Sequence, residues 1–298
     1  MNATVCTLFE GDYHLGAAAL VNSLHASGFR GRIICGYRGE LPAWSNQAIG
    51  RGADLSITFL PVDATFHLTY HKPQFMKLCL ERSPPNHEAV FYFDPDIVVK
   101  APWEVIARWA RGGVALVEDI NGYMPAHHPY RLAWTDFLKA HGMHVVRELD
   151  HYYNAGFIGV PHEAEGLLDR WAEINELALA QSQGKLKNDK PHALFHSADQ
   201  DALNLALMTT YAPVNGAGPE AMDFTPGGHL LSHAVGGSKP WRAGFLRDSL
   251  RGRPPSRAAR AFYDHVTAPV RIFSSAELWR RRFSLQCAAA LGRVYRRT

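Results

Sequence analysis

Residues 87–100 decide the fold class, and they read His-Glu-Ala-Val-Phe-Tyr-Phe-Asp-Pro-Asp-Ile-Val-Val-Lys. The run from Ala89 to Phe93 is apolar or aromatic throughout, and a Pro-Pro-Asn turn signal precedes it. An apolar run bounded in this way predicts a strand buried on both faces, as in a parallel sheet. Asp94 and Asp96 would then lie where this strand leaves the sheet, because Pro95 cannot continue the ladder.

The two carboxylates have two interpretations. Ligands of open α/β sheets bind at the carboxyl ends of central strands. Asp94 and Asp96 could share a divalent cation there, and that cation could hold a diphosphate. The structural alternative is a plain Asp-Pro-Asp turn, since about one Asp-x-Asp is expected by chance in a chain of this length.

Strand-like and helical segments alternate along the chain. This order predicts an α/β fold with a mostly parallel central sheet and helices on its faces. Residues 120–153 are rich in His, Tyr and Pro, and we expect a loop and a short helix there, over the site. The predicted strands cover residues 4–9, 32–37, 55–62, 89–93, 113–117, 154–160 and 228–235, and the helices 14–27, 73–81, 103–110, 163–180 and 198–208.

The composition is that of an ordinary globular protein. The 298 residues are 47% hydrophobic and 20% charged, enough for one large or two small domains. No apolar segment reaches the roughly 18–20 residues of a membrane span, and the first residues lack the features of a signal peptide. The four cysteines form no Cys-x-x-Cys pair, which predicts free thiols in a reducing compartment. We therefore expect a cytoplasmic protein.

Charge is distributed unevenly along the chain. Residues 246–298 carry a net charge of +9, whereas residues 1–245 carry −6. We expect a catalytic domain over residues 1–245 and an arginine-rich helical extension over residues 246–298. One side of the predicted helix in this extension is formed by Trp279, Phe283, Cys287, Ala290 and Val294.

This amphipathic helix could lie on anionic lipid at the inner face of a membrane, as a peripheral contact. Alternatively it packs on the domain, with its arginines solvated or paired. Nucleic acid is not an expected partner, because the basic residues lack a recognisable binding fold.

A second informative stretch, His233-Ala-Val-Gly-Gly-Ser-Lys-Pro-Trp241, lies about 140 residues after the carboxylates. The imidazole of His233 could complete a metal site, since mixed oxygen and nitrogen ligation suits Mn²⁺. Gly236 would let backbone N–H groups approach phosphate oxygens, and Lys239 would supply a positive charge. The alternative is a loop with an incidental histidine, since the chain has 16.

With this stretch, the chain resembles the family 8 glycosyltransferases and their relatives, which have a GT-A fold. The resemblance spans about residues 4–245. The five matching stretches occur in the family's order: Glu10-Gly-Asp-Tyr13, Asp94-Pro-Asp96, Asn154-Ala-Gly156, Asp199-Gln-Asp201 with Asn204, and His233-x-x-Gly236-x-x-Lys239-Pro-Trp241. Pro95 departs from the small or aliphatic residue that is usual in the family.

The resemblance implies a role for each matching residue. Mn²⁺ or Mg²⁺ would be held by Asp94, Asp96 and His233, and would bridge the diphosphate of a nucleotide sugar, expected to be a UDP-sugar. Gly236 and Lys239 would contact that diphosphate. Tyr13 would stack on the base, and Glu10 could accept its ring N–H. Lys77 would reach the donor, and Asp119 and Asn154 would line the sugar pocket. The catalytic residues Asp199 and Gln200 would lie next to the anomeric carbon.

Several of these residues also have structural interpretations. Asn154 could satisfy backbone groups at a strand entry. Asp199 could cap the helix over residues 198–208. Tyr13 could belong to the core.

The prediction is a metal-dependent glycosyltransferase of the hexosyltransferase type that acts on a carbohydrate or lipid-linked acceptor, with retention if the family mechanism holds. One alternative is an enzyme like a sugar-nucleotide pyrophosphorylase, although residues 7–16 lack the basic loop that it would need. Another is a non-catalytic nucleotide-sugar-binding protein of an envelope polysaccharide system. The sequence does not identify the donor sugar, the acceptor or the oligomeric state.

Overall fold

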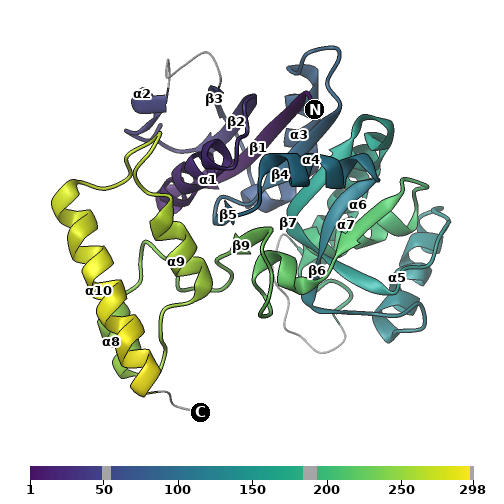
Figure 1. The fold of residues 1–298 in the computed structure, drawn as a ribbon. Coiled ribbons are helices and arrows are strands. Elements are labelled where there is room, and N and C mark those ends of the chain that lie inside the picture. Colours follow the sequence, from purple (N-terminus) through teal and green to yellow (C-terminus); the bar gives the residue numbers. More distant parts are fainter. Residues whose placement is uncertain (49–54, 184–192, 296–298) are drawn as a thin grey trace.

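The computed structural model describes residues 1–48, 55–183 and 193–295. Its central element is a seven-stranded sheet in the order β3-β2-β1-β4-β7-β6-β8 (Figure 1). β7 is antiparallel to both of its neighbours, and the other pairs are parallel. The predicted α/β class with a mostly parallel sheet is therefore confirmed. The bounds are β1 Ala3–Glu10, β2 Arg32–Arg38, β3 Ser56–Pro61, β4 Ala89–Phe93, β6 Val114–Tyr123, β7 His151–Pro161 and β8 Val214–Ala217.

A second, two-stranded sheet is formed by β5 (Ile97–Val99) and β9 (Leu231–His233), which are antiparallel. The apolar run of residues 89–99 thus contributes to two sheets, and Asp94-Pro-Asp96 is the connection between them. This connection leaves the main sheet at the end of β4 and turns into a pairing with a segment about 130 residues later in the chain.

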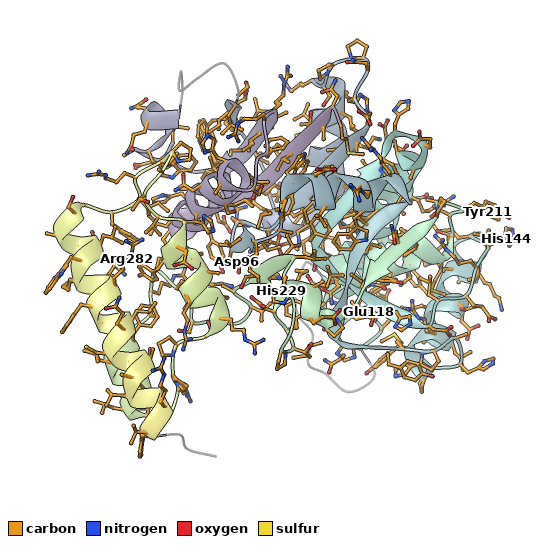
Figure 2. The ribbon with its side chains drawn as sticks, viewed as in Figure 1. Asp96, Glu118, His144, Tyr211, His229 and Arg282 are labelled. Atoms are coloured by element: carbon orange, nitrogen blue, oxygen red, sulfur yellow. The ribbon has the colours of Figure 1, made fainter. Side chains whose placement is uncertain are left out.

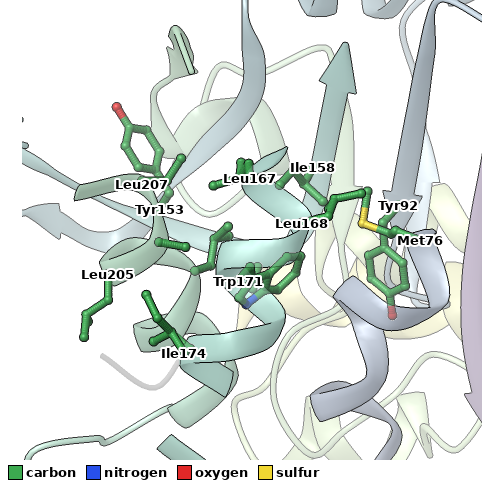
Figure 3. Close-up of a cluster of buried hydrophobic side chains, with 14 of the residues drawn as sticks. Met76, Tyr92, Tyr153, Ile158, Leu167, Leu168, Trp171, Ile174, Leu205 and Leu207 are labelled. Atoms are coloured by element: carbon green, nitrogen blue, oxygen red, sulfur yellow. The ribbon is translucent and has the colours of Figure 1, made fainter. Parts of the chain in front are cut away.

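The main sheet has helices on both faces. α1 (His14–Ala26) and α4 (Trp103–Arg111) cover one face; α3 (Lys72–Glu81), α6 (Gly166–Ser182) and α7 (Ala198–Met208) cover the other. Because side chains alternate along a strand, Phe91 of β4 packs toward the first face and Tyr92 toward the second. Figure 3 shows the hydrophobic cluster on the second face, between the sheet and α3, α6 and α7, in which Trp171 of α6 packs near Leu168 and Ile158.

The short elements complete the chain. They are α2 (Ser45–Ala48) and the 3-10 helices at Gly11–Tyr13, Leu68–His71, His162–Ala164 and Pro219–Met222.

The prediction of a loop and a short helix over residues 120–153 is partly wrong. β6 continues to Tyr123, where it pairs with His151, and α5 spans the twelve residues Pro129–Ala140. The end of β6 passes beyond the buried core, so most of its residues are polar and give no apolar strand pattern. Arg131 of α5 is buried and donates to the carbonyl groups of Met124 and His151, which holds this region together.

The C-terminal residues form α8 (Phe245–Leu250), α9 (Arg257–Asp264) and α10 (Ser275–Val294). The segment is fastened to α1, since the Asn22 amide donates to the carbonyl groups of His265 and Val270 at 2.8 Å each. α10 and α8 lie side by side at one end of the molecule, drawn in yellow and green in Figure 1. The predicted helix in the tail is confirmed. None of the helices in the described ranges is long and apolar enough to cross a membrane.

Candidate functional site

A cleft of about 820 Å³ opens at the carboxyl edge of the main sheet. Its walls include the ends of β1 and β4, the polar part of β6, the start of β7 and the first turn of α7. All the residues predicted for the site line this cleft except Lys77. Asp96 lies near the middle of the molecule, whereas His144 and Tyr211 lie at its periphery (Figure 2).

The Asp94-Pro-Asp96 segment is a tight turn with a defined geometry. The N–H of Ile97 donates to the carbonyl of Asp94 at 3.0 Å, which closes a four-residue turn with Pro95 at its second position. Proline suits that position because its φ is fixed near the required value. The turn interpretation and the site interpretation of this motif are therefore compatible, because the turn aims both carboxylates into the cleft.

The pairing of β5 with β9 brings His233 to these carboxylates. His233 lies opposite Ile97 in the ladder, and the N–H of Ala234 donates to the carbonyl of Asp96 at 3.0 Å. The Nε2 atom of His233 is 3.2 Å from Asp96 Oδ1 and 3.8 Å from Asp94 Oδ2. The structure thus assembles Asp94, Asp96 and His233 as the sequence predicts, with ligand atoms within 4.8 Å of one another.

Gly156 fits against this cluster because it has no side chain. A Cβ atom there would lie 2.6 Å from Cε1 of His233, 2.8 Å from Oδ1 of Asn154 and 3.0 Å from Oδ2 of Asp94. These distances are too short for a methyl group, so the glycine of the Asn-Ala-Gly stretch leaves the space that the three polar side chains occupy.

Two buried lysines balance the charge of the carboxylates. Lys239 Nζ is 2.5 Å from Asp96 Oδ2 and donates to the carbonyl of Ala234 at 2.7 Å. Burial acts to raise the pKa of Asp96, but His233 and Lys239 more than offset it and hold that pKa well below its usual value. Asp96 therefore stays ionised, as a cation ligand requires.

Lys72 occupies the equivalent position beside Asp94. Its Nζ lies 3.0 Å from Asp94 Oδ1 and 3.3 Å from Asp199 Oδ2, and it donates to the carbonyl of Ala155 at 2.9 Å. Burial opposes the charge on Lys72, but the two carboxylates more than offset it and raise the pKa of the ammonium group. Lys72 thus joins the carboxylate turn to the start of α7.

The three residues have the chemistry of a divalent cation site. Two carboxylates and an imidazole are a donor set that suits Mn²⁺, and the carboxylates alone suit Mg²⁺. The other ring nitrogen of His233, Nδ1, is buried and has no hydrogen-bond partner among the described residues. The polar contacts that orient the ring are therefore those of Nε2 with the carboxylates of Asp94 and Asp96.

A second hydrogen-bond network lines the floor of the cleft. The Asp119 carboxylate accepts from Asn154 Nδ2 at 2.8 Å and from Gln200 Nε2 at 3.1 Å. The side-chain oxygen of Gln200, Oε1, in turn accepts the N–H of Ala155 at 3.2 Å. Asn154 and Gln200 were predicted separately as site residues, and this network orients both through the Asp119 carboxylate.

At the start of α7, the acidic side chain that accepts backbone N–H groups is Asp201 and not Asp199. The helix begins after Ser197, and it is Asp201 whose carboxylate accepts the N–H groups of His196 and Ser197, at 2.7 and 2.9 Å. Asp199 instead faces the cleft and Lys72. Burial raises the pKa of Asp199 in spite of the opposing charge of Lys72.

Glu10 and Tyr13 line the far end of the cleft. Glu10 already pairs with Arg38, whose Nε donates to Oε2 at 2.6 Å. The Tyr13 ring has Lys239 Nζ at 5.5 Å and the Arg242 guanidinium at 5.3 Å from its centroid, and it meets the Trp241 ring edge-on. Gly236 has a φ of +86°, a conformation that glycine adopts without strain.

The assignment of Lys77 is not supported by the geometry. The side chain of Lys77 is 44% exposed on α3, and its ammonium group pairs with Asp169 of α6. The lysine in the cleft is Lys72, at the first residue of the same helix. Since a helix that connects parallel strands begins at the carboxyl edge of the sheet, its first residue was the better choice. Lys77 lies about 7.5 Å further along the axis.

Sequence reasoning missed several other lining residues. Tyr92 donates from its hydroxyl to Asp94 Oδ1 at 3.0 Å, and its place on an alternating strand could have revealed it. Aromatic side chains form one wall of the cleft, and all but His196 come from residues 120–153, where the prediction was partly wrong. This aromatic wall consists of Tyr123, His128, Tyr130, Trp134, Tyr152 and His196.

No protein-family model matches the sequence, and no curated protein matches it. Solved structures do match. The bifunctional glycosyltransferase WbbM, in its apo form, superposes with a TM-score of 0.57 and 17% identity, over 94% of this chain and 51% of that one. An active-site mutant of LgtC gives 0.54 and 16%, over 94% and 99%. GlyE of Streptococcus pneumoniae gives 0.54 and 12%, over 97% and 64%.

The likeness establishes the fold, which is the GT-A fold of glycosyltransferases. The predicted fold class is confirmed, and membership of family 8 stays a prediction. This chain spans about half the length of the WbbM chain.

Proposed function

We propose that the protein is a metal-dependent glycosyltransferase that moves a hexosyl group from a UDP-sugar to an acceptor hydroxyl with retention of configuration. The proposal depends mainly on one observation: Asp94, Asp96 and His233 lie together in one cleft, which Lys239, Asp199 and Gln200 also line. Two observations from the comparisons support it. The similar structures named above are glycosyltransferases, and a further one is LgtC, a galactosyltransferase, in complex with donor and acceptor sugar analogs.

Asp94, Asp96 and His233 would hold Mn²⁺ or Mg²⁺ in this proposal. When bound, such a cation supplies positive charge that stabilises a departing diphosphate. Lys239 is placed to add to this charge, because its ammonium group is already beside Asp96. The backbone at Gly236 would approach the phosphate oxygens, and Tyr13 would stack on the base while Glu10 accepts its ring N–H.

The sugar would lie over the network of Asp119, Asn154 and Gln200. An amide is a poor nucleophile, so we favour attack of the acceptor hydroxyl on the same face from which the diphosphate departs. The bond between the anomeric carbon and the diphosphate breaks, the bond to the acceptor oxygen forms, and the acceptor proton passes to the departing phosphate oxygen. Asp199 and Gln200 would position the anomeric carbon and carry its developing charge.

The acceptor would enter past the aromatic wall. Sugar rings and apolar aglycones pack against aromatic faces, so Tyr123 and Tyr130 suit a carbohydrate or a lipid-linked acceptor. Ile120, Tyr123 and Trp279 are among the large apolar side chains that the chain leaves exposed.

The tail is proposed to contact a membrane surface. α10 buries Ala288 and Gly292 against the protein, whereas Trp279 and Phe283 are exposed and their rings stack at 5.4 Å. The apolar side predicted from the sequence therefore faces solvent and is available to lipid, with arginines beside it.

Donor turnover tests the proposal. The full chain is incubated with a panel of nucleotide sugars and Mn²⁺, and release of the nucleotide and transfer to sugar acceptors are measured. We expect turnover of a UDP-sugar, its loss with a chelator, and its loss in Asp96→Asn. His229→Gln is a matched control because His229 is exposed and lies four residues before His233 in the sequence. Full activity in the presence of the chelator would overturn the metal-dependent mechanism.

A further inference from the structure

A second cluster of possible metal ligands lies at the opposite edge of the sheet from the cleft. His87 lies two residues before the start of β4, and His162 directly follows β7, the strand antiparallel to β4. Glu165 is the residue before α6. Asp94 leaves the other end of β4, so about five residues of extended strand, roughly 17 Å, separate the two clusters.

Both imidazole rings converge on one carboxylate oxygen. His87 Nε2 is 2.6 Å from Glu165 Oε1, and His162 Nδ1 is 2.9 Å from the same atom. The two rings meet edge-on with their centroids 5.0 Å apart. The three ligand atoms lie within 4.8 Å of one another.

The hydrogen bonds of His87 call for a cation at this point. Its Nδ1 is 3.0 Å from the carbonyl oxygen of Pro84, which can only accept, so Nδ1 carries the hydrogen. A neutral ring has one N–H, and its Nε2 lone pair then faces the Glu165 carboxylate. This contact is favourable only with a positive charge in it, either a second ring proton or a metal ion.

Metal-bound histidines commonly donate their other ring N–H to a carbonyl group, as His87 does to Pro84. His162 Nδ1 lies 2.9 Å from the same carboxylate oxygen and offers a second nitrogen ligand. We propose that His87 Nε2, His162 Nδ1 and Glu165 form a binding site for Zn²⁺ or a similar late first-row cation.

A zinc ion would require the Glu165 carboxylate to move away from the two ring nitrogens. Tetrahedral zinc with bonds of about 2.0–2.2 Å keeps its ligand atoms about 3.3 Å apart. Glu165 would therefore withdraw by less than about 1 Å, which its partly exposed side chain allows. The His162 side chain is 59% exposed, so the fourth position is open to water. Two imidazoles with one carboxylate favour zinc over the Mn²⁺ or Mg²⁺ of the catalytic site.

Such an ion would tie the loop before β4 to the connection between β7 and α6. The N–H of His162 already donates to the carbonyl of Glu88 at 2.9 Å, so the two segments are registered by their backbones. Binding to the folded state alone would raise the stability of the protein.

Zinc binding to the full chain, free of any affinity tag, tests this site. Isothermal titration and metal analysis after gel filtration give the affinity and the bound equivalents. We expect one zinc equivalent that survives in His233→Gln and in His144→Gln, which alters an exposed histidine elsewhere. In His162→Gln and Glu165→Gln the affinity should fall more than about tenfold.

Two further readouts separate this site from a folding defect. Zinc should raise the melting temperature of the parent and of His233→Gln but not that of His162→Gln. Co²⁺ should give the visible absorption of a low-coordinate ion in the parent and not in Glu165→Gln. Parent-like zinc affinity in both His162→Gln and Glu165→Gln would overturn the proposal. So would loss of the bound equivalent in His233→Gln alone.

Discussion

The ammonium group of Lys72 lies 3.3 Å from the carboxylate of Asp199, and both side chains are buried. Through this contact the first residue of α3 holds the start of α7, and through Asp94 it also holds the carboxylate turn at the end of β4. Removing the lysine would leave two carboxylates facing each other without a counter-charge.

Lys72→Met should therefore destabilise the protein by about 3–5 kcal/mol, because breaking a buried ion pair leaves an uncompensated charge. The measurement is urea unfolding followed by circular dichroism. Lys77→Met, on the same helix, is the matched control, since its exposed pair with Asp169 should change the stability by less than about 1 kcal/mol. Equal effects of the two substitutions would contradict this account of Lys72.

Gly156→Ala should disturb the cation site. The new methyl group would press on His233 and Asp94, so we expect a stability loss of about 1–3 kcal/mol and weaker Mn²⁺ binding. Thermal unfolding and Mn²⁺ titration measure the two effects. At Gly166, the first residue of α6, an added Cβ meets no heavy atom of the described residues within 4 Å, so Gly166→Ala should be tolerated. A fully active Gly156→Ala variant would show that the cluster tolerates expansion.

His233→Gln should raise the Mn²⁺ concentration needed for half-maximal activity by more than about tenfold, because one of three ligands is lost. His229→Gln should leave this concentration unchanged, as His229 is exposed. The metal dependence of donor turnover provides the readout. An unchanged Mn²⁺ requirement in His233→Gln would remove the histidine from the proposed site.

Asp201 should contribute a pH dependence to stability. Burial, partly offset by hydrogen bonds from Tyr152 and the backbone, raises its pKa from 3.8 to about 6. Because the folded-state pKa is the higher one, the proton stabilises the folded state. Its contribution is fully present below pH 4 and is lost as the pH rises through about 6.

Two pKa units correspond to about 3 kcal/mol. Asp201→Asn should therefore gain stability relative to the parent by up to that amount between pH 4 and 7. Unfolding free energies at several pH values would show the trend. A difference between the two proteins that is constant with pH would refute it.

Trp279→Ala combined with Phe283→Ala should reduce binding to anionic vesicles at least several-fold, because both exposed rings leave the apolar side of α10. Co-sedimentation at low and high salt measures this. Tyr211→Ala removes an exposed aromatic ring at another part of the surface and serves as control. Equal binding of all three proteins would separate the tail from membrane contact.

The fold was largely predictable from the sequence because its strands are short apolar runs separated by amphipathic helices. Residues 89–93 could be placed on a central strand from their pattern alone. β8 was missed because Val214–Ala217 is short and contains a glycine. The helix α5 was predicted only as a short helix without bounds, because His and Pro residues at its start are also typical of loops.

The site was predictable where motifs carry side chains next to strand ends, as with Asp94, Asp96 and Asn154. The partnership of His233 with the carboxylates depends on the β5–β9 ladder, and a three-residue strand gives no signal of its pairing partner. The choice between Lys72 and Lys77 depended on the direction of a helix relative to the sheet. Long-range networks such as Asp119 with Asn154 and Gln200 need the tertiary structure.

The ring of Trp241 contacts two aromatic side chains, Tyr13 at the cleft and Phe262 of α9. It meets Tyr13 edge-on at 5.5 Å at the cleft and lies 5.5 Å from Phe262 of α9 on its other side. A displacement of α9 would therefore reach Tyr13, which lines the cleft. If the tail docks on a membrane, docking and donor affinity become thermodynamically linked, and each would change the other by the same factor.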